Sequence, residues 1–172
     1  MTEIGKLRAA PDGDRGIVVT RVFDAPRDVV FEAYTRPELV QHWLGTFGGW
    51  EMIVCVIEPK VGGTWRFVWS GPKGERIGWR AVCRTFDPPE RITSVRSFDE
   101  PAFRGSEVAT ITFTEHGSRT VLAATFEYDS REARDDVLES PLLQGMAASY
   151  DRLAEILDAP AERWMDSEAG VP

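Results

Sequence analysis

The chain has 172 residues, of which 42% are hydrophobic and 28% are charged. This balance is too apolar for a disordered chain and too interrupted by charge for a membrane span, so it indicates one soluble globular domain. The 20 basic and 28 acidic side chains give a net charge of −8, which disfavours nucleic acid and membrane insertion.

The first predicted elements are a strand and two short helices. Residues 1–16 are polar and lack the apolar run of a secretory signal, so we expect a flexible tail and a cytoplasmic protein. Residues 17–23 are rich in β-branched side chains and predict the first strand. Pro26 favours a helix start, Pro37 separates a second short helix, and Gly45 ends it.

Further strands and a long helix follow. Short gaps rich in Gly, Pro and Asp separate the strands, which predicts an antiparallel meander because parallel strands need long crossovers. Apolar residues recur with helical spacing over residues 142–157 and predict an amphipathic helix that covers the sheet. This order indicates an α+β domain over residues 17–157 and a flexible tail over residues 158–172. The predicted strands cover residues 52–57, 64–69, 77–86, 91–98, 108–114 and 120–128.

Large aromatic side chains concentrate on two neighbouring strands. Trp65, Phe67 and Trp69 alternate onto one face, and the next strand adds Trp79, while later strands offer small residues such as Ala109. Core packing is one interpretation, and it is favoured for any single ring. The other is an aromatic-lined cavity, because a long helix over a curved sheet can leave a gap. For the rings as a group, both interpretations stay equally supported.

A glycine-aromatic loop over residues 45–50 follows the second short helix. Its glycines and its two large rings suit a gate over a cavity mouth. The alternative is a loop whose rings tuck into the core, and this is the slightly favoured interpretation.

The histidines and the motif content indicate no catalytic chemistry. His42 and His116 are the only histidines, and the sequence lacks the spacing patterns of zinc, nucleotide and catalytic-triad sites. We therefore assign no catalytic residue, no metal and no cofactor.

Charged residues on the predicted strands are interpreted as solvated. Glu107 and Glu127 would meet only if their strands pair, and a solvated edge is the favoured position for both. Arg80, Arg84 and Arg96 are likewise interpreted as solvated, with an anion clamp at a cavity wall as the less favoured alternative.

Several local segments resemble one known superfamily, and the resemblance spans residues 17–157. They resemble the START-like (SRPBCC, helix-grip) superfamily, and within it most closely the bacterial family named after the heat-shock chaperone ATPase activator. The resemblance implies a curved antiparallel sheet wrapped around a long C-terminal helix, with two short helices after the first strand. It also implies a hydrophobic ligand between sheet and helix. The segments that carry the resemblance are residues 23–31, 37–39 with Trp43, 62–67, 87–92 and 145–153.

One position departs from the pattern of this family. Its last helix often carries Gly-Trp, where this chain has Gly145-Met146. Methionine is flexible and polarizable, so the expected cavity is reshaped at that point.

The resulting hypothesis is a non-catalytic domain that binds a small hydrophobic molecule, lipid-like, aromatic or polyketide-like. A polyketide cyclase or hydratase that uses His42, Tyr150 or a buried carboxylate is the enzyme alternative. A chaperone-interacting stress-response module is the third hypothesis, and homodimerisation stays open. The expected ligand-binding residues are Trp43, Phe47, Trp65, Phe67, Trp69, Trp79, Met146 and Tyr150.

Overall fold

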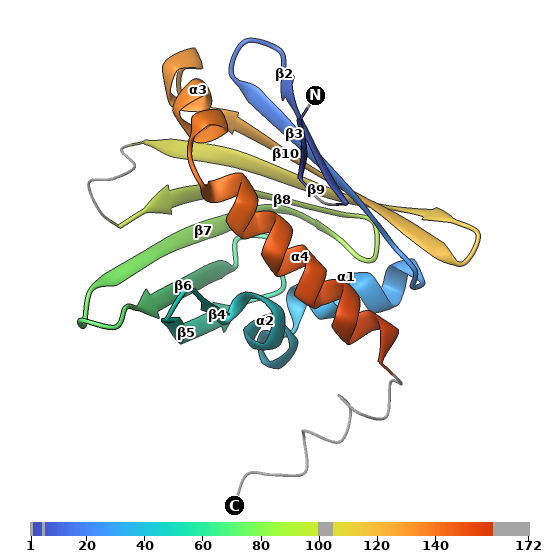
Figure 1. Ribbon diagram of the computed structural model, residues 1–172. Helices are drawn as coiled ribbons and strands as arrows, with labels where there is room; N and C mark the ends of the chain where they lie inside the picture. The colour runs from blue at the N-terminus through green and yellow to red at the C-terminus, as the bar shows by residue number, and fades with distance from the viewer. Residues whose placement is uncertain (1, 5, 100–104, 160–172) are drawn as a thin grey trace, which may run out of the picture.

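The computed structural model describes residues 2–4, 6–99 and 105–159. These residues form one antiparallel sheet of ten strands in the order β1-β2-β3-β10-β9-β8-β7-β6-β5-β4, with helix α4 crossing its concave face (Figure 1). The strands are β1 (Thr2–Ile4), β2 (Leu7–Asp12), β3 (Gly16–Phe23), β4 (Thr46–Phe47), β5 (Trp50–Ile57), β6 (Thr64–Ser70), β7 (Arg76–Asp87), β8 (Arg91–Phe98), β9 (Ser106–His116) and β10 (Arg119–Tyr128). The helices are α1 (Arg27–Thr35), α2 (Pro37–Leu44), α3 (Arg131–Glu139) and α4 (Leu142–Asp158).

The α+β helix-grip architecture predicted from the sequence is confirmed. Two short helices, α1 and α2, follow β3, and the long helix α4 packs across the curved sheet (Figure 1). Helix α3 precedes α4, and the Ser130 hydroxyl caps its first turn by accepting a hydrogen bond from the Ala133 amide at 3.1 Å. No helix among the described residues is long and apolar enough to cross a membrane.

The N-terminal segment differs from the flexible tail that we expected over residues 1–16. Strands β1 and β2 extend the sheet beyond β3, with Ala9 opposite Val19. Leu7 is 0% exposed, so the segment contributes to the core. The alternation of Leu7 and Ala9 fits a strand with one buried face, but so short a pattern is hard to distinguish from a polar tail. Beyond Ala159, the expected C-terminal tail lies outside the described residues.

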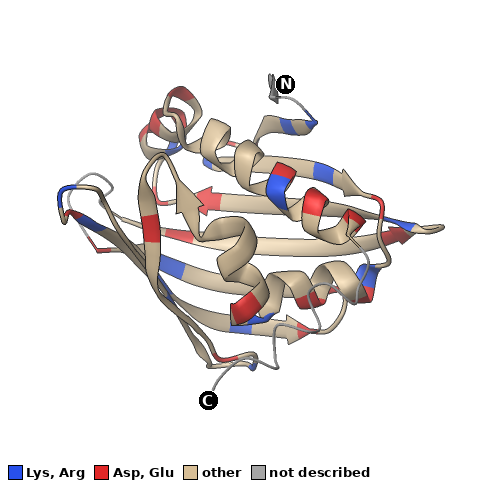
Figure 2. Cartoon of the chain, turned by 60° about the horizontal axis from the view of Figure 1, so that its bottom comes forward, with Lys and Arg blue, Asp and Glu red and all other residues tan. Residues whose placement is uncertain are grey.

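The register of the strands brings five side chains into one row on the concave face. Trp65 pairs with Ala81, Ala81 with Arg96, Arg96 with Glu107, and Glu107 with Tyr128. The row crosses from β6 to β10 and therefore joins the aromatic strands to two charged residues. Figure 2 shows that most charged residues elsewhere gather at strand ends and on helices.

Candidate functional site

The segment predicted as a glycine-aromatic loop is a tight β-hairpin. Thr46 pairs with Glu51 and Phe47 with Trp50, which leaves a turn of two residues, Gly48 and Gly49. Their φ angles are 50° and 85°, and two positive angles in succession are what a type I′ turn requires. The turn therefore places Phe47 and Trp50 side by side on one face of the hairpin.

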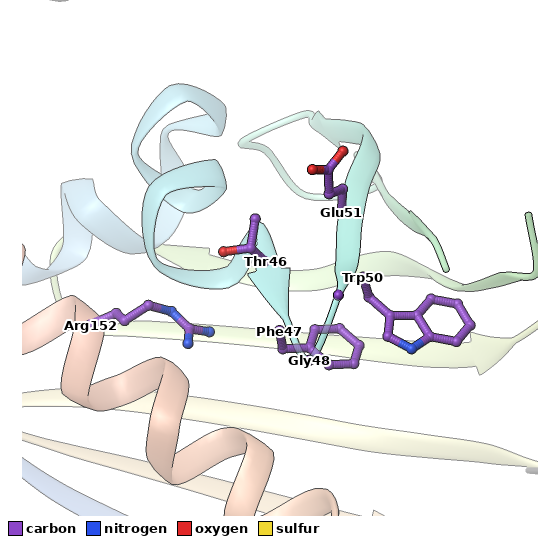
Figure 3. A pocket seen from close by; sticks show the side chains of 7 residues that line it. Thr46, Phe47, Gly48, Trp50, Glu51 and Arg152 are labelled. Carbon is purple, nitrogen blue, oxygen red and sulfur yellow. The ribbon is translucent and has the colours of Figure 1, made fainter. Parts of the chain in front are cut away.

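An open depression of about 360 Å³ lies between this hairpin and helix α4 (Figure 3). The hairpin supplies one wall, and Arg152 reaches in from α4. The depression therefore lies between the β4 edge of the sheet and the C-terminal helix. Its lining residues are Thr46, Phe47, Gly48, Gly49, Trp50, Glu51 and Arg152.

Aromatic rings connect this depression with the interior. Phe47 is 38% exposed, and its ring lies parallel to that of Trp50 with centroids 6.1 Å apart. On its other side, Phe47 meets Trp69 edge to face at 6.1 Å. Trp69 is buried and contacts Phe67, which in turn meets Trp79 at 4.5 Å. The exposed ring of Phe47 is thus the outer end of a continuous aromatic array.

Among the described residues of the lining, Arg152 is the single basic one, and two neutral acceptors hold its guanidinium. Its Nε donates to the Trp43 carbonyl at 3.0 Å, and one Nη donates to the Ser149 hydroxyl at 3.2 Å. Ser149 donates in turn to the Gly145 carbonyl at 3.0 Å. Figure 3 shows the guanidinium extended from α4 toward Thr46 and Phe47. Its direction is therefore fixed by the protein.

Seven of the eight ligand-binding residues expected from the sequence fall into two groups. Trp65, Phe67, Trp69 and Trp79 contact one another on the concave face, and of these Trp79 alone is half-buried. Of the eight expected residues, Phe47 is the one that lines the depression.

The second group lies around helix α4. Trp43 and Tyr150 are buried, with ring centroids 6.0 Å apart, and both contact Tyr34. The Trp43 indole donates to the Ala33 carbonyl at 2.9 Å, which fixes it in the core. Met146 is half-buried and packs against the core cluster. These contacts assign the second group to the packing of α4 against α1 and α2.

The interpretation of Arg96 and Glu107 as solvated is wrong. The Arg96 side chain is 14% exposed, and one of its Nη atoms lies 3.4 Å from a carboxylate oxygen of the buried Glu107. The guanidinium lies over the Trp79 ring at 4.6 Å and the Phe126 ring at 5.5 Å. Flanking rings and an opposite charge in register make the buried position tolerable. The Nε of Arg96 has no hydrogen-bond partner among the described residues.

The other charged strand residues do lie where the sequence predicts. Glu127 is exposed and pairs with the exposed Arg15, and Arg80 and Arg84 are exposed as well. His42 and His116 are exposed too. Within the part of the chain that the structure describes, no three His, Cys, Asp or Glu side chains are placed to hold a metal ion.

Burial perturbs several interior groups. It raises the pKa of the Glu107 carboxyl, an effect that Arg96 and a hydrogen bond with Tyr128 oppose. Burial also raises the pKa of Tyr34 and Tyr150, whose hydroxyls share a hydrogen bond of 3.0 Å. The acid, the arginine and the phenols therefore add polar groups to the largely apolar interior beneath α4.

Sequence reasoning missed Arg152 and Glu51 as lining residues, and it considered Trp50 only as part of a loop that could cover a cavity mouth. A Gly-Gly pair between two aromatic residues is a readable hairpin signal, and it predicts that Trp50 joins Phe47. Arg152 carries no comparable signal, because helical periodicity places it on the polar side of α4 and does not show which element approaches that side.

Comparisons with known proteins give the family and the fold. A family model described as activator of Hsp90 ATPase homolog 1-like protein matches residues 24–158. A crystal structure from Rhodobacter sphaeroides is 30% identical with a TM-score of 0.83, and the match covers 90% of this chain and 99% of that chain.

Two more distant structures show the fold alone. Protein Ms6760 from Mycobacterium smegmatis is 22% identical with a TM-score of 0.77, over 89% of this chain and 97% of that chain. A solution structure from Arthrobacter aurescens is 20% identical with a TM-score of 0.77, over 90% and 92%. No protein of curated function matches the chain.

Proposed function

Because the chain belongs to the activator of Hsp90 ATPase homolog 1-like family, we propose that it is a module that binds a small hydrophobic molecule between the sheet and helix α4. The fold and the family support two classes of function, a ligand-binding module and a module like the activators of the Hsp90 ATPase. The geometry of the depression favours the first.

The observation that carries this proposal is the depression between the hairpin and α4. Its volume of about 360 Å³ falls at the lower end of the range of small-molecule sites, roughly 300–1,000 Å³. The parallel rings of Phe47 and Trp50 give it an aromatic wall. A molecule with one or two aromatic rings fits this size and this wall better than a long acyl chain does.

Tryptophan fluorescence tests the proposal directly, because Trp50 lines the depression and Trp69 lies behind Phe47. Neutral 2-naphthamide is the probe, since it has two fused rings and no charge. We expect saturable quenching with the wild-type protein. Phe47→Ala should weaken binding by about two- to tenfold, the loss of one aromatic contact.

Ile53→Ala is the matched control for Phe47→Ala. Ile53 lies on β5, is 48% exposed and does not line the depression, so its truncation should leave the affinity unchanged. If the wild type shows no saturable signal up to high-micromolar probe, or if both variants behave alike, the proposal is wrong.

The enzyme alternative has one supporting observation, the buried acid Glu107. A carboxyl with a raised pKa suits a general acid, and Tyr128 and Arg96 contact it. The same contacts are also what an ion pair with a purely structural role would make. Glu107 moreover does not line the depression, which weakens the enzyme alternative. Turnover of a cyclisable polyketone that Glu107→Gln abolishes without loss of binding would support the enzyme; no turnover by the wild type would contradict it.

The chaperone-interacting alternative rests on apolar side chains on the convex face of the sheet. Val82, Val95 and Val108 pair in register across β7, β8 and β9, and Val82 and Val108 are exposed. Such a row suits contact with another protein. Stimulation of an Hsp90-type ATPase that Val82→Lys abolishes would support this function, and absence of both stimulation and complex formation would contradict it.

A further inference from the structure

We propose that Arg152 binds the carboxylate of an aromatic acid in the depression, so that the ligand of this site is an aromatic monocarboxylate. This inference rests on the proposed binding function and adds the charge of the ligand to it. Three features of the lining carry it: an arginine that forms no ion pair with a described residue, a fixed guanidinium, and aromatic rings beside it.

The first feature is the charge balance of Arg152. Among the residues whose side chains the structure describes, no carboxylate forms an ion pair with it. Its neighbour Asp151 is held by Arg21, at 2.7 Å. Arg152 is also half-buried, and a charge that is partly removed from water interacts more strongly with a ligand charge than an exposed one.

The second feature is the fixed direction of the guanidinium. Its bonds to the Trp43 carbonyl and the Ser149 hydroxyl use Nε and one Nη. The other Nη forms no hydrogen bond with a described residue, and the group extends toward the hairpin (Figure 3). A guanidinium held in one orientation loses little side-chain entropy when it binds a carboxylate.

The third feature is the aromatic wall. Phe47 and Trp50 lie on one face of the hairpin, so a ring that packs against them can direct an acidic substituent toward Arg152. Glu51 is the one acidic residue among the described residues of the lining. It is exposed, and strand alternation places it on the face opposite Trp50. A cationic ligand would therefore meet only a solvated acid, whereas an anionic one meets a half-buried base.

Arg152 also has a structural use, which the experiment must separate. Its Nε bond satisfies the Trp43 carbonyl in the last turn of α2, where helix carbonyls lack partners within the helix. Loss of the side chain would then disturb α2 and the hairpin that follows it. Such a disturbance weakens the binding of any ligand, charged or neutral.

The test compares 2-naphthoate with 2-naphthamide, which share one ring system and differ in charge. We expect the wild type to bind naphthoate at least tenfold more tightly, in line with a hydrogen bond between two charged groups. Arg152→Gln should remove this preference, so that naphthoate binding weakens at least tenfold more than naphthamide binding does. Arg152→Lys keeps the positive charge but loses the planar pair of N–H donors that can bind both carboxylate oxygens, so it should retain part of the preference. Added salt should weaken naphthoate binding alone.

Arg80→Gln is the matched control. Arg80 is exposed on β7 and outside the lining, so this variant lowers the net charge equally and should bind both ligands as the wild type does. Equal affinities of the wild type for both ligands, or equal weakening of both by Arg152→Gln, would overturn the inference while the binding function stands. If neither ligand binds, the proposed function itself fails. If Arg152→Gln does not fold, the wild-type comparison and Arg152→Lys decide.

Discussion

Tyr34 on α1 and Tyr150 on α4 face each other in the core, with their hydroxyl oxygens 3.0 Å apart. Both side chains are buried, and the hydrogen bond ties the long helix to the first short one. In such a pair each hydroxyl provides a hydrogen-bond partner that replaces the water molecule the other hydroxyl loses on burial. Removal of one hydroxyl therefore leaves the other without its partner.

Tyr150→Phe should lower the free energy of unfolding by about 1–3 kcal/mol, because Tyr34 then keeps a buried unpaired hydroxyl. The double variant Tyr34→Phe/Tyr150→Phe should be at least as stable as Tyr150→Phe alone, since no unpaired group remains. Urea denaturation of the two single variants and the double variant measures this coupling. Losses that simply add would show that the two hydroxyls do not interact.

The buried tyrosines should also make the protein less stable at alkaline pH. Burial raises the pKa of Tyr34, Tyr128 and Tyr150 above the ordinary value of 10, so the folded state holds these protons more tightly than the unfolded state. Stability from this source is fully present below about pH 10 and falls as the pH rises further. Unfolding free energies between pH 8 and 11.5 measure the fall, which should be smaller in Tyr34→Phe/Tyr150→Phe.

Two thiols add to this pH dependence, and their contribution needs a separate control. Burial raises the pKa of Cys55 to about 11, so its contribution falls in the same direction but begins near the pKa of a free thiol. Burial raises the pKa of the Cys83 thiol as well, so Cys55→Ser/Cys83→Ser removes the thiol part and leaves the tyrosine part. Absorbance of the folded protein at 295 nm reports tyrosinate directly, and half-ionisation of the tyrosines near pH 10, as for exposed phenols, would contradict the buried positions of the three phenols.

Buried and exposed ion pairs should respond very differently to truncation. Glu107→Ala leaves Arg96 as an uncompensated buried charge and should cost about 3–5 kcal/mol. Glu127→Ala breaks the exposed pair with Arg15 and should cost less than about 1 kcal/mol. The double variant Arg96→Met/Glu107→Leu should recover most of the loss. Equal costs for the two glutamates, measured by chemical denaturation, would argue against a buried ion pair.

The position of Glu107 shows where sequence reasoning stopped. Ala109, Ile111 and Phe113 alternate onto the concave face, and the same alternation carries Glu107 there. Because Glu107 is charged, it was nevertheless expected to lie in solvent. The deciding factor was Arg96 directly opposite on β8, a pairing set by the register between β8 and β9, which alternation within one strand does not specify. Local alternation predicted the strands well. The pairing of charged side chains on neighbouring strands became clear only from the structure.

For the candidate site too, local elements could be predicted from the sequence, but their arrangement in space could not. Helical spacing predicted the long helix, whereas residues 45–50 were predicted as a loop and form a hairpin in the structure. The meeting of Arg152 with that hairpin depends on how α4 crosses the sheet, which no local pattern encodes. The aromatic residues chosen from strand alternation do cluster, but most of them lie behind Phe47 in the core.

The N-terminal strands provide a prediction where the structure departs from the expected tail. Leu7 on β2 is fully buried, so Leu7→Ala should cost about 2–5 kcal/mol through lost burial and the cavity left behind. Val61→Ala is the control, because Val61 is exposed and its truncation should change stability little. If Leu7→Ala is as stable as Val61→Ala in urea, the N-terminal strand does not contribute to the core.

The Gly-Gly turn links stability to the proposed site. Gly48 has a φ of 50°, and a Cβ there would meet no atom within 4 Å, so Gly48→Ala tests backbone conformation alone. It should cost about 1–2 kcal/mol, and Gly48→Asn less, because asparagine tolerates this conformation. Gly49→Ala adds a contact of 3.1 Å with Pro72 and should cost more.

Ligand binding should follow the same order as stability in these hairpin variants. The turn sets the rings of Phe47 and Trp50 side by side, so Gly48→Ala should weaken naphthamide binding, whereas Gly48→Asn should largely retain it. Fluorescence titration and urea denaturation of the same samples give both quantities. Weak binding in both variants with unchanged stability would mean that the turn contacts the ligand itself. Unchanged binding in Gly49→Ala despite a clear loss of stability would separate the hairpin from the binding site.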